Sequence, residues 1–223
     1  MTDSPFVVAI DGPAGAGKST MARRLADRLG MRYLDTGALY RAIAYYLHTR
    51  NIPPYESASL DGALESISVI IAESGILLDG EDVGNEIRSP LVDSIVSSYA
   101  ALPSVRKRLL AIQQNQGEKG ALLADGRDMG TVVFPGADVK VFLTASDEIR
   151  ARRRLLEMQE RGENVPYEEV LRTIRERDKI DSERDAAPLR KAGDAVEINT
   201  DKLSIEEAVE LLASIITKRR RGQ

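Results

Sequence analysis

The sequence predicts an α/β fold in which a parallel sheet is covered by helices on both faces. Several short apolar runs lack clean alternation, which fits strands buried on both faces. Helical stretches lie between most of these runs, and strands that alternate with helices favour a parallel sheet. The chain has 223 residues, of which 43% are hydrophobic and 30% charged. That length and composition suit one sizeable α/β domain with room for small insertions.

The expected strands are apolar runs that mostly stop at a polar turn residue. Four of them are followed directly by Asp11, Asp35, Asp125 and Asn199, and the fifth runs out at Thr144. The runs cover residues 6–10, 31–34, 121–124, 139–143 and 195–198.

The expected helices repeat apolar residues at helical spacing. The first covers residues 19–29 and ends at Gly30, a residue type that commonly stops helices. The other expected helices cover residues 38–47, 92–114, 147–159, 167–177 and 205–219.

Residues 52–90 break this rhythm. Short strands are expected at residues 68–72 and 76–78, joined by Glu73-Ser74-Gly75 and followed by Asp79-Gly80. An Asp-Gly pair is a strong hairpin signal. We expect a small β-containing insertion at about residues 52–90.

Residues 150–187 form a second excursion, which is long, highly charged and contains Gly162 and Pro166. Two interpretations stay open from the residues alone. The segment is either a mobile helical lid or an ordinary pair of solvated helices.

Composition excludes several classes of function. The chain has 31 basic and 35 acidic residues, a net charge of −4, which is a poor match for a duplex-binding surface. It has no cysteine, so disulfides, zinc-thiolate sites, iron–sulfur clusters and thiol nucleophiles are excluded. His48 is the only histidine and cannot build a histidine-rich metal site. Because no apolar run approaches about 18 residues, we expect no membrane span and a cytoplasmic location.

One motif indicates phosphate chemistry. Its residues match the Walker A pattern in full, with an apolar run before it and a helical stretch after it. Glycines let backbone N–H groups curl around a phosphate, and the helix N-terminus favours an anion. Lys18 can reach the β- and γ-phosphates of ATP, and the Ser19 hydroxyl can ligate Mg²⁺. The segment reads Gly12-Pro13-Ala14-Gly15-Ala16-Gly17-Lys18-Ser19, followed by Thr20.

The type of P-loop protein follows from size and from a missing motif. A GTPase would need an Asn-Lys-x-Asp segment, which is absent, and a large motor ATPase would need a longer chain. A kinase of a small metabolite is favoured. Asp125 ends an apolar run where a Walker B carboxylate would help to organise Mg²⁺.

Arginines in suggestive settings could stabilise a phosphoryl group during transfer. Arg41 follows a Thr36-Gly37 turn, and Arg127 with Asp128 follows the run that ends at Asp125. Arg106 lies early in an expected helix, while Arg177, Asp181 and Arg184 are spaced to share one helix face if that helix persists.

Several segments together resemble bacterial cytidylate kinases over essentially the whole chain. They are residues 12–20, Asp35-Thr36-Gly37-Ala38-Leu39-Tyr40-Arg41, residues 125–135, and residues 177–184 with Ala187-Pro188-Leu189. The Asp-Gly-Arg-Asp segment is highly specific, whereas the Walker A motif alone is not.

The resemblance implies a single P-loop kinase domain, 1–223, with an adenylate-kinase-like core. It also implies a nucleoside-monophosphate-binding region at 36–108 and a lid at 150–187. The reaction would move the γ-phosphoryl group of ATP to CMP or dCMP with Mg²⁺, in a monomer that binds neither nucleic acid nor membrane. Lys18, Arg127 and Arg184 would be the catalytic residues.

The resemblance also assigns substrate contacts. Thr36, Arg41 and Arg127 would hold the CMP phosphate; Ser97, Arg106 and Asp128 would read cytosine; Arg177 and Asp181 would meet the sugar hydroxyls; and Arg184 would approach the transferring phosphate. The family usually has Ser at the position of Thr36, and Lys179 and Ile180 replace an acidic and a basic residue. These departures leave the packing at Thr36 and the charge of the lid open.

Cytosine chemistry supports the base-reading set independently. The N4 amino group can donate to the Asp128 carboxylate, while O2 and N3 suit an Arg fork and a Ser hydroxyl. Uracil would present a carbonyl to the same carboxylate. The alternatives are a kinase of another small acceptor, such as shikimate, gluconate or a different nucleotide, and a P-loop switch that regulates a partner.

Overall fold

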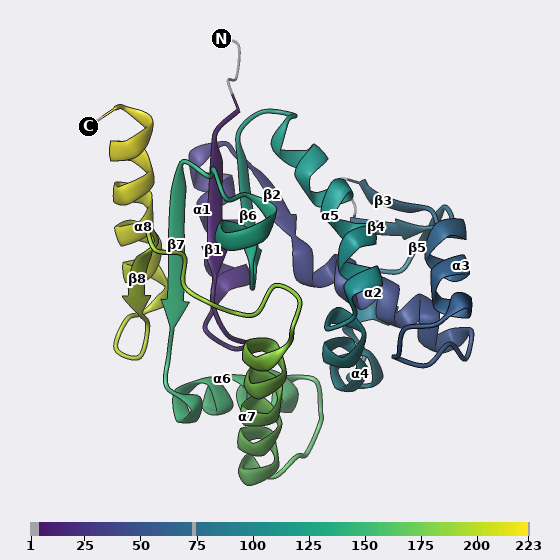
Figure 1. The fold of residues 1–223 in the computed structure, drawn as a ribbon. Helices are drawn as coiled ribbons and strands as arrows, with labels where there is room; N and C mark the ends of the chain where they lie inside the picture. Colours follow the sequence, from purple (N-terminus) through teal and green to yellow (C-terminus); the bar gives the residue numbers. More distant parts are fainter. Residues whose placement is uncertain (1–4, 73–74, 223) are drawn as a thin grey trace. The chain divides into compact units, whose positions relative to one another are not determined.

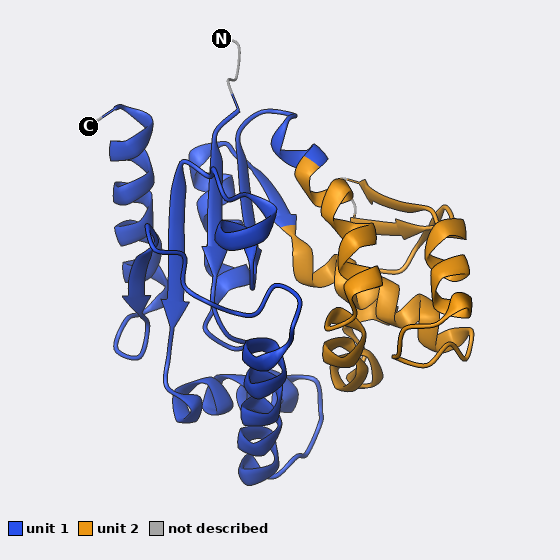
Figure 2. Ribbon diagram, in the orientation of Figure 1, with its two compact units in different colours: residues 1–34, 115–223 blue, residues 35–114 orange. Residues whose placement is uncertain are grey.

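The computed structural model describes residues 5–72 and 75–222 and divides the chain into two compact units. The first unit comprises Met1–Leu34 with Asn115–Gln223, and the second comprises Asp35–Gln114 (Figure 2). The region expected at residues 36–108 lies within the second unit. Its role in binding an acceptor stays a prediction.

The first unit contains a five-stranded sheet in the order β2-β6-β1-β7-β8 (Figure 1). The pairs β1–β6, β1–β7 and β7–β8 are parallel. All the expected strands are present, each within about two residues of its predicted bounds. The strands are β1 (Val7–Asp11), β2 (Arg32–Asp35), β6 (Leu122–Gly126), β7 (Val139–Thr144) and β8 (Val196–Asn199).

One face of this sheet is covered by α1 (Lys18–Leu29) and α8 (Ile205–Arg220). Val8 and Ile10 of β1 point into this core, together with Leu25 of α1 and Leu212 of α8. Because side chains alternate along a strand, Asp11 points to the opposite face. There it meets η2 (Met129–Val133), a short π-helix that packs against β1 and β6. The predicted fold class is therefore confirmed.

Burial on both faces is confirmed only for the two central strands. Every residue of β6 is buried, as are the last four of β1. At the edge, Val196 of β8 is 43% exposed.

Two further helices of the first unit form the segment expected as a lid. They are α6 (Asp147–Glu160) and α7 (Tyr167–Glu183), which share a small apolar core that includes Ala151 and Ile174. The end predicted at residue 177 was wrong, because α7 runs on to Glu183.

The second unit contains helices and a three-stranded antiparallel sheet, β3-β4-β5. The hairpin predicted at Asp79-Gly80 is confirmed, because both residues have positive φ, 49° and 89°, as a tight two-residue turn requires. The predicted connection through Glu73 and Ser74 lies outside the described residues. The strands are β3 (Val69–Ala72), β4 (Gly75–Leu78) and β5 (Glu81–Asp82).

One helix prediction in this unit was wrong. The single helix expected at residues 92–114 is two helices, α4 (Pro90–Ala100) and α5 (Pro103–Gly117). Proline lacks an N–H group and is suited to the first turn of a helix, so Pro103 starts a new helix instead of continuing the old one.

The β-containing insertion expected at about residues 52–90 is present, and it also holds a helix that was not predicted, α3 (Ala58–Ser66). Ser57 caps this helix, because its side chain accepts a hydrogen bond from the Leu60 N–H at 3.2 Å. The remaining elements of the unit are α2 (Thr36–Thr49) and η1 (Glu86–Arg88). Within the described ranges, no helix combines the length and apolarity needed to cross a membrane.

Candidate functional site

The phosphate-binding loop joins β1 to α1, and its backbone leaves no room for a side chain at some of its glycines. Gly12 has φ of 150°, and a Cβ atom there would lie 2.1 Å from the carbonyl oxygen of Leu143. Gly17, the N-cap of α1, has φ of 88° and offers no side chain to cap the helix. The first N–H groups of α1 therefore receive no side-chain cap from Gly17, which leaves that helix end suited to an anion.

Lys18 lies buried at the start of α1, and its Nζ donates to the carbonyl oxygen of Pro13 at 2.7 Å. Burial, and after it the nearby positive charge of Arg127, lower the pKa of Lys18 to about 7. Asp125 and Asp181 oppose this shift. An arriving anion would favour the charged form of Lys18.

Two hydroxyl groups bind the buried carboxylate of Asp125. Ser19 Oγ donates to Oδ2 at 2.9 Å, and Tyr33 Oη donates to Oδ1 at 2.7 Å. A hydroxyl and a carboxylate in contact form an all-oxygen donor set, which is the set that Mg²⁺ prefers. The residues expected at a Mg²⁺ site therefore fit that ion chemically.

Four charged side chains form one network: two come directly after β6, one lies in the last turn of α7 and one directly follows α7. Arg127 Nε donates to Asp181 Oδ2 at 2.8 Å. Arg184 lies 3.7 Å from Asp181 and 3.6 Å from Asp128, in each case measured from a guanidinium nitrogen to a carboxylate oxygen. Arg184 follows the end of α7, and its Nε donates to the carbonyl oxygen of Ala187 at 2.9 Å.

The pKa values in this network reflect burial and charge together. Burial raises the pKa of the Asp181 carboxyl, but the guanidinium groups of Arg127 and Arg177 outweigh it and hold the pKa below its usual range. Burial also lowers the pKa of Arg127, and Asp181 more than restores it. The Arg127–Asp181 pair therefore stays ionised near neutral pH.

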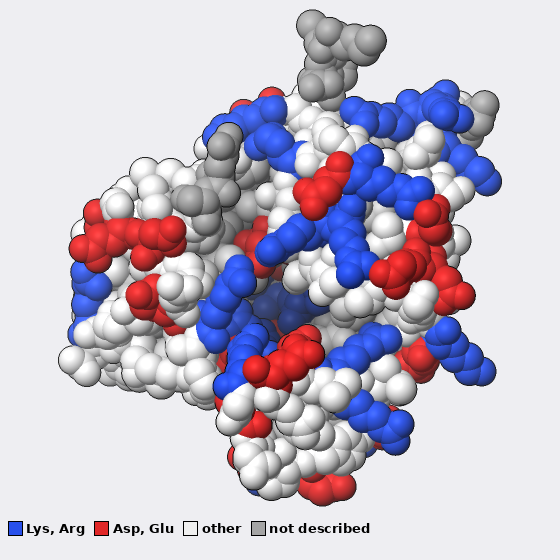
Figure 3. Space-filling model, turned by 180° about the vertical axis from the view of Figure 1, so that it is seen from behind, with Lys and Arg blue, Asp and Glu red and all other residues white. Residues whose placement is uncertain are grey.

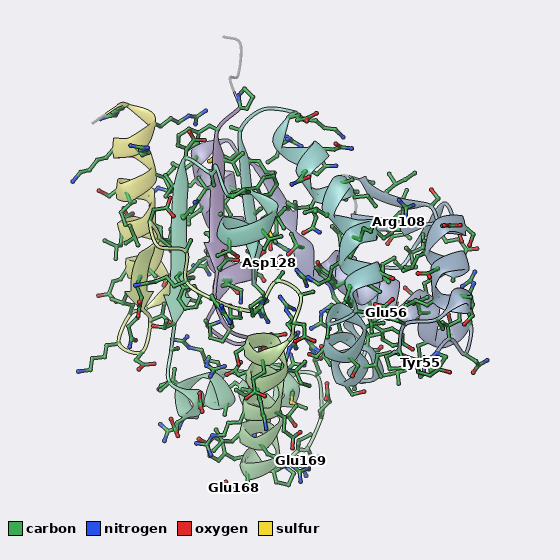
Figure 4. All side chains as sticks on the ribbon, viewed as in Figure 1. Tyr55, Glu56, Arg108, Asp128, Glu168 and Glu169 are labelled. Carbon is green, nitrogen blue, oxygen red and sulfur yellow. The ribbon has the colours of Figure 1, made fainter. Side chains whose placement is uncertain are left out.

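Asp128 lies just past the end of β6, where η2 begins (Figure 4). Its side chain is buried and makes no capping hydrogen bond to that helix. Asp11 makes those bonds instead, because its carboxylate accepts from the N–H groups of Met129 and Gly130 at 2.7 and 2.8 Å. Burial raises the pKa of Asp11 to about 6.

Arg150 begins the segment for which the sequence left two interpretations open, a lid or a pair of solvated helices. It is only 2% exposed. Its guanidinium donates to the carbonyl oxygen of Ala14 in the phosphate-binding loop and pairs with Asp147 and Asp178. It thus ties α6 and α7 to the loop. Figure 3 shows other basic side chains mixed with acidic ones on the face drawn there.

A pocket of about 190 Å³ lies beside the phosphate-binding loop in the first unit, and sequence reasoning missed it. Arg153 forms part of its wall and donates to both oxygens of Thr200, at 3.1 Å to Oγ1 and 2.7 Å to the carbonyl. Apart from Gly15, Gly17 and Thr20 of the phosphate-binding loop, its lining belongs to no sequence motif. It is lined by Gly15, Gly17, Thr20, Met21, Arg153, Glu157, Thr200, Leu203, Ser204, Ile205 and Ala208.

The second unit holds the other predicted acceptor residues. Thr36 is buried in the first turn of α2, which Asp35 caps by accepting from the Ala38 N–H at 3.0 Å. Arg41, also on α2, pairs with Asp93 of α4. The α2–α4 packing places these residues on neighbouring helices.

Ser97 and Arg106 are buried on α4 and α5 of the same unit. The Arg106 guanidinium donates to the carbonyl oxygen of Ala100 at 3.1 Å and lies 5.2 Å from the centre of the Tyr40 ring. Nearby, Arg108 donates to the carbonyl oxygens of Leu64 and Ile67 (Figure 4). Arg108 thus serves the packing of this unit.

The predicted residues therefore divide into two groups. The first unit brings together the phosphate-binding loop, Asp125 and the network of Arg127, Asp128, Asp181 and Arg184, with Arg177 close enough to affect the pKa of Lys18. The second unit holds Thr36, Arg41, Ser97 and Arg106 on α2, α4 and α5.

The fold and the site of the first unit define a P-loop nucleotide-binding protein. A sequence model described as cytidylate kinase matches residues 8–218. A protein of Fervidobacterium nodosum named cytidylate kinase is 50% identical over 95% of this chain and 96% of its own length. One of Thermosipho melanesiensis with the same name is 46% identical over 96% and 98%. The chain therefore belongs to the cytidylate kinase family.

A solved structure also shares the fold. An uncharacterized protein from Eubacterium ventriosum superposes with a TM-score of 0.53, covering 96% of this chain and 99% of that one at 13% identity. At that identity the likeness concerns the fold alone.

Proposed function

We propose that the protein transfers the γ-phosphoryl group of ATP to CMP or dCMP, giving ADP and CDP or dCDP. The observation that supports this most is the network after β6. It sets the carboxylate of Asp128 beside Arg184 in the same compact unit as the phosphate-binding loop. Membership of the cytidylate kinase family supports the same substrates.

The donor nucleotide would occupy the phosphate-binding loop. Backbone N–H groups of residues 12–20, other than Pro13, would donate to its phosphates, and Lys18 would contact the β- and γ-phosphates. The pocket beside the loop, with Arg153 and Thr200 in its wall, would receive the donor base. Ser19 would ligate Mg²⁺, and Asp125, which accepts a hydrogen bond from Ser19, would help to organise the site; when bound, the ion neutralises phosphate charge.

The acceptor would meet residues of both groups. Thr36, Arg41 and Arg127 would hold its phosphate. In the structure Arg41 pairs with Asp93, and Arg127 pairs with Asp181. An acceptor phosphate would compete with these carboxylates for the two arginines. An arginine presents a planar fork that suits two phosphate oxygens.

The cytosine base and the sugar would take the remaining residues. Ser97, Arg106 and Asp128 would read cytosine, with the carboxylate accepting from its amino group. Arg177 and Asp181 would meet the sugar hydroxyls. A uracil in the same place would turn a carbonyl oxygen toward Asp128, an unfavourable pairing.

The transfer itself needs positioned charge and no covalent intermediate. An oxygen of the acceptor phosphate attacks the γ-phosphorus, and the bond to the oxygen bridging the β- and γ-phosphorus atoms breaks. Negative charge develops on the transferring oxygens and on the leaving oxygen. Lys18, Arg127 and Arg184 would stabilise that charge, and the buried setting strengthens each interaction.

The test is to incubate the protein with ATP, Mg²⁺ and CMP and to quantify the nucleotides by chromatography. We expect ADP and CDP to form in equal amounts, with little ATP consumed when CMP is omitted. Lys18→Ala should abolish the reaction with the fold intact, whereas the exposed Lys119→Ala should not. ATP hydrolysis that is indifferent to CMP would favour a P-loop switch. That the protein is a monomer and that it lies in the cytoplasm both stay predictions. Sedimentation would test the monomeric state.

A further inference from the structure

Asp11 links the phosphate-binding loop to the segment that bears Arg127 and Asp128. It is the last residue of β1 and directly precedes Gly12. Its carboxylate is 4% exposed and accepts from the N–H groups of Met129 at 2.7 Å and Gly130 at 2.8 Å. The strand that leads into the donor site thus holds the backbone immediately after the predicted acceptor residues.

These two hydrogen bonds replace an ordinary helix cap. The first N–H groups of a helix have no partner within it, and the side chain of the N-cap residue commonly supplies one. Asp128 is the N-cap of η2, but its side chain makes no capping bond. Its backbone joins the helix, since its carbonyl oxygen accepts from the N–H groups of Val132 and Val133. Asp11 caps η2 in place of Asp128.

The backbone at Gly130 lies in a tight space between Asp11 and β7. A Cβ atom at Gly130 would lie 3.4 Å from Asp11 Oδ2 and 3.2 Å from Cδ of Lys140. Lys140 is itself fixed, because its ammonium group pairs with Asp194 at 2.9 Å. Asp11 and Lys140 therefore hold the start of η2 from two sides. This fixes the backbone at Asp128 and so the direction in which its side chain points.

We propose that Asp11 is a positioning residue for recognition of the acceptor base: it caps η2 so that the Asp128 carboxylate is directed to the nucleotide and not to the helix. The proposal rests on the proposed function, because it concerns the site that would read cytosine. Asp11 acts through Asp128 and touches no reacting atom.

The test compares Asp11→Asn with the wild type. Asparagine keeps the size and one acceptor oxygen, but its NH₂ group would face one of the two backbone N–H groups. The KM for CMP should rise about tenfold or more, as expected when a hydrogen bond to a charged group is lost. The ratio of kcat/KM for CMP over UMP should fall. The KM for ATP should change less than about twofold, because the donor site keeps its contacts.

Two further measurements separate positioning from mere stability. Backbone amide hydrogen exchange at Met129 and Gly130 should be faster in Asp11→Asn than in wild type. Leu212→Val, in the core on the other face of the sheet, should lower the melting temperature. It should not change the KM for CMP and the KM for ATP by different factors. Gly130→Ala, which crowds the same junction, should reproduce the CMP defect if Asp11→Asn folds poorly.

The outcomes are distinct. A wild-type protein without CMP turnover would overturn the proposed function. A wild type that turns over CMP, with an unchanged KM for CMP in both Asp11→Asn and Gly130→Ala, would overturn only the positioning role. Equal changes in both KM values, as in Leu212→Val, would also overturn it.

Discussion

Ser19 and Asp125, 106 residues apart in sequence, are joined by a hydrogen bond of 2.9 Å from Ser19 Oγ to Asp125 Oδ2. The helix that begins at the phosphate-binding loop is thereby tied to the end of β6. Tyr33 of β2 donates to the other carboxylate oxygen at 2.7 Å, and so fixes the orientation of Asp125. The orientation of Asp125, which would help to organise Mg²⁺ next to Ser19, thus depends on a tyrosine outside every recognised motif.

Tyr33→Phe should weaken the binding of Mg²⁺ in the reaction. It removes one hydrogen bond to Asp125 but keeps the ring, which lies 5.6 Å from the Arg23 guanidinium. The Mg²⁺ concentration that gives half-maximal rate should rise about five- to tenfold, with kcat nearly restored at saturating Mg²⁺. Calorimetric titration of Mg²⁺–ATP should show the same loss. Tyr99→Phe removes a comparable bond, to the Ile52 carbonyl in the second unit, and should leave Mg²⁺ dependence unchanged.

The lowered pKa of Lys18 predicts that ATP binding takes up a proton. With a pKa of about 7, Lys18 is charged in the free protein below pH 7 and mostly neutral well above it. Bound phosphates favour the charged form, so uptake should approach about one proton per ATP near pH 8.5 and vanish toward low pH. Calorimetry in buffers of different ionisation enthalpy measures this. Uptake that persists in Lys18→Ala would assign the proton to another group.

Arg127 is predicted to act on the acceptor phosphate through its fork geometry. Arg127→Lys keeps the charge and loses the fork. Turnover should fall about tenfold or more, and Arg41→Lys should behave alike. Arg152→Lys, on the exposed side of α6, is the matched control and should have little effect. Equal effects at all three positions would contradict the assignment.

Asp128→Ala should change substrate preference more than stability. Losing a hydrogen bond to the cytosine amino group should lower kcat/KM for CMP by about 10- to 100-fold. UMP should lose much less, because the carboxylate that repels its carbonyl is gone. Since Asp11 caps η2, the melting temperature should fall only slightly. An unchanged CMP-to-UMP ratio with a large loss of stability would make Asp128 structural.

The fold was predictable from the sequence where local signals agree with packing. The five apolar runs became strands of one sheet, and for β1 and β6 the reason is that strands buried on both faces need continuous apolar sequence. The split between α4 and α5 was missed because helical periodicity continues across Pro103, which nevertheless starts a new helix. The helix α3 was missed because it is short and lies between turn-rich segments.

The site was predictable where a motif fixes its own geometry. The phosphate-binding loop is local in sequence, so Lys18 and Ser19 could be named at once. Tyr33, Arg150, Arg153 and Asp11 could not, because their roles depend on partners that are distant in sequence. Asp11 meets Gly130 only because β1 and η2 pack together, at a sequence separation of 119 residues.

The most direct test of the proposed function is the specificity constant of the wild-type protein for a panel of acceptors. Initial rates of ADP formation would be measured with ATP and Mg²⁺ and varied CMP, dCMP, UMP, AMP and GMP. We predict that kcat/KM is highest for CMP or dCMP and at least about tenfold lower for UMP, since uracil has a carbonyl oxygen where the cytosine amino group would donate to Asp128. Equal values for CMP and UMP, or a preference for AMP or GMP, would contradict the account.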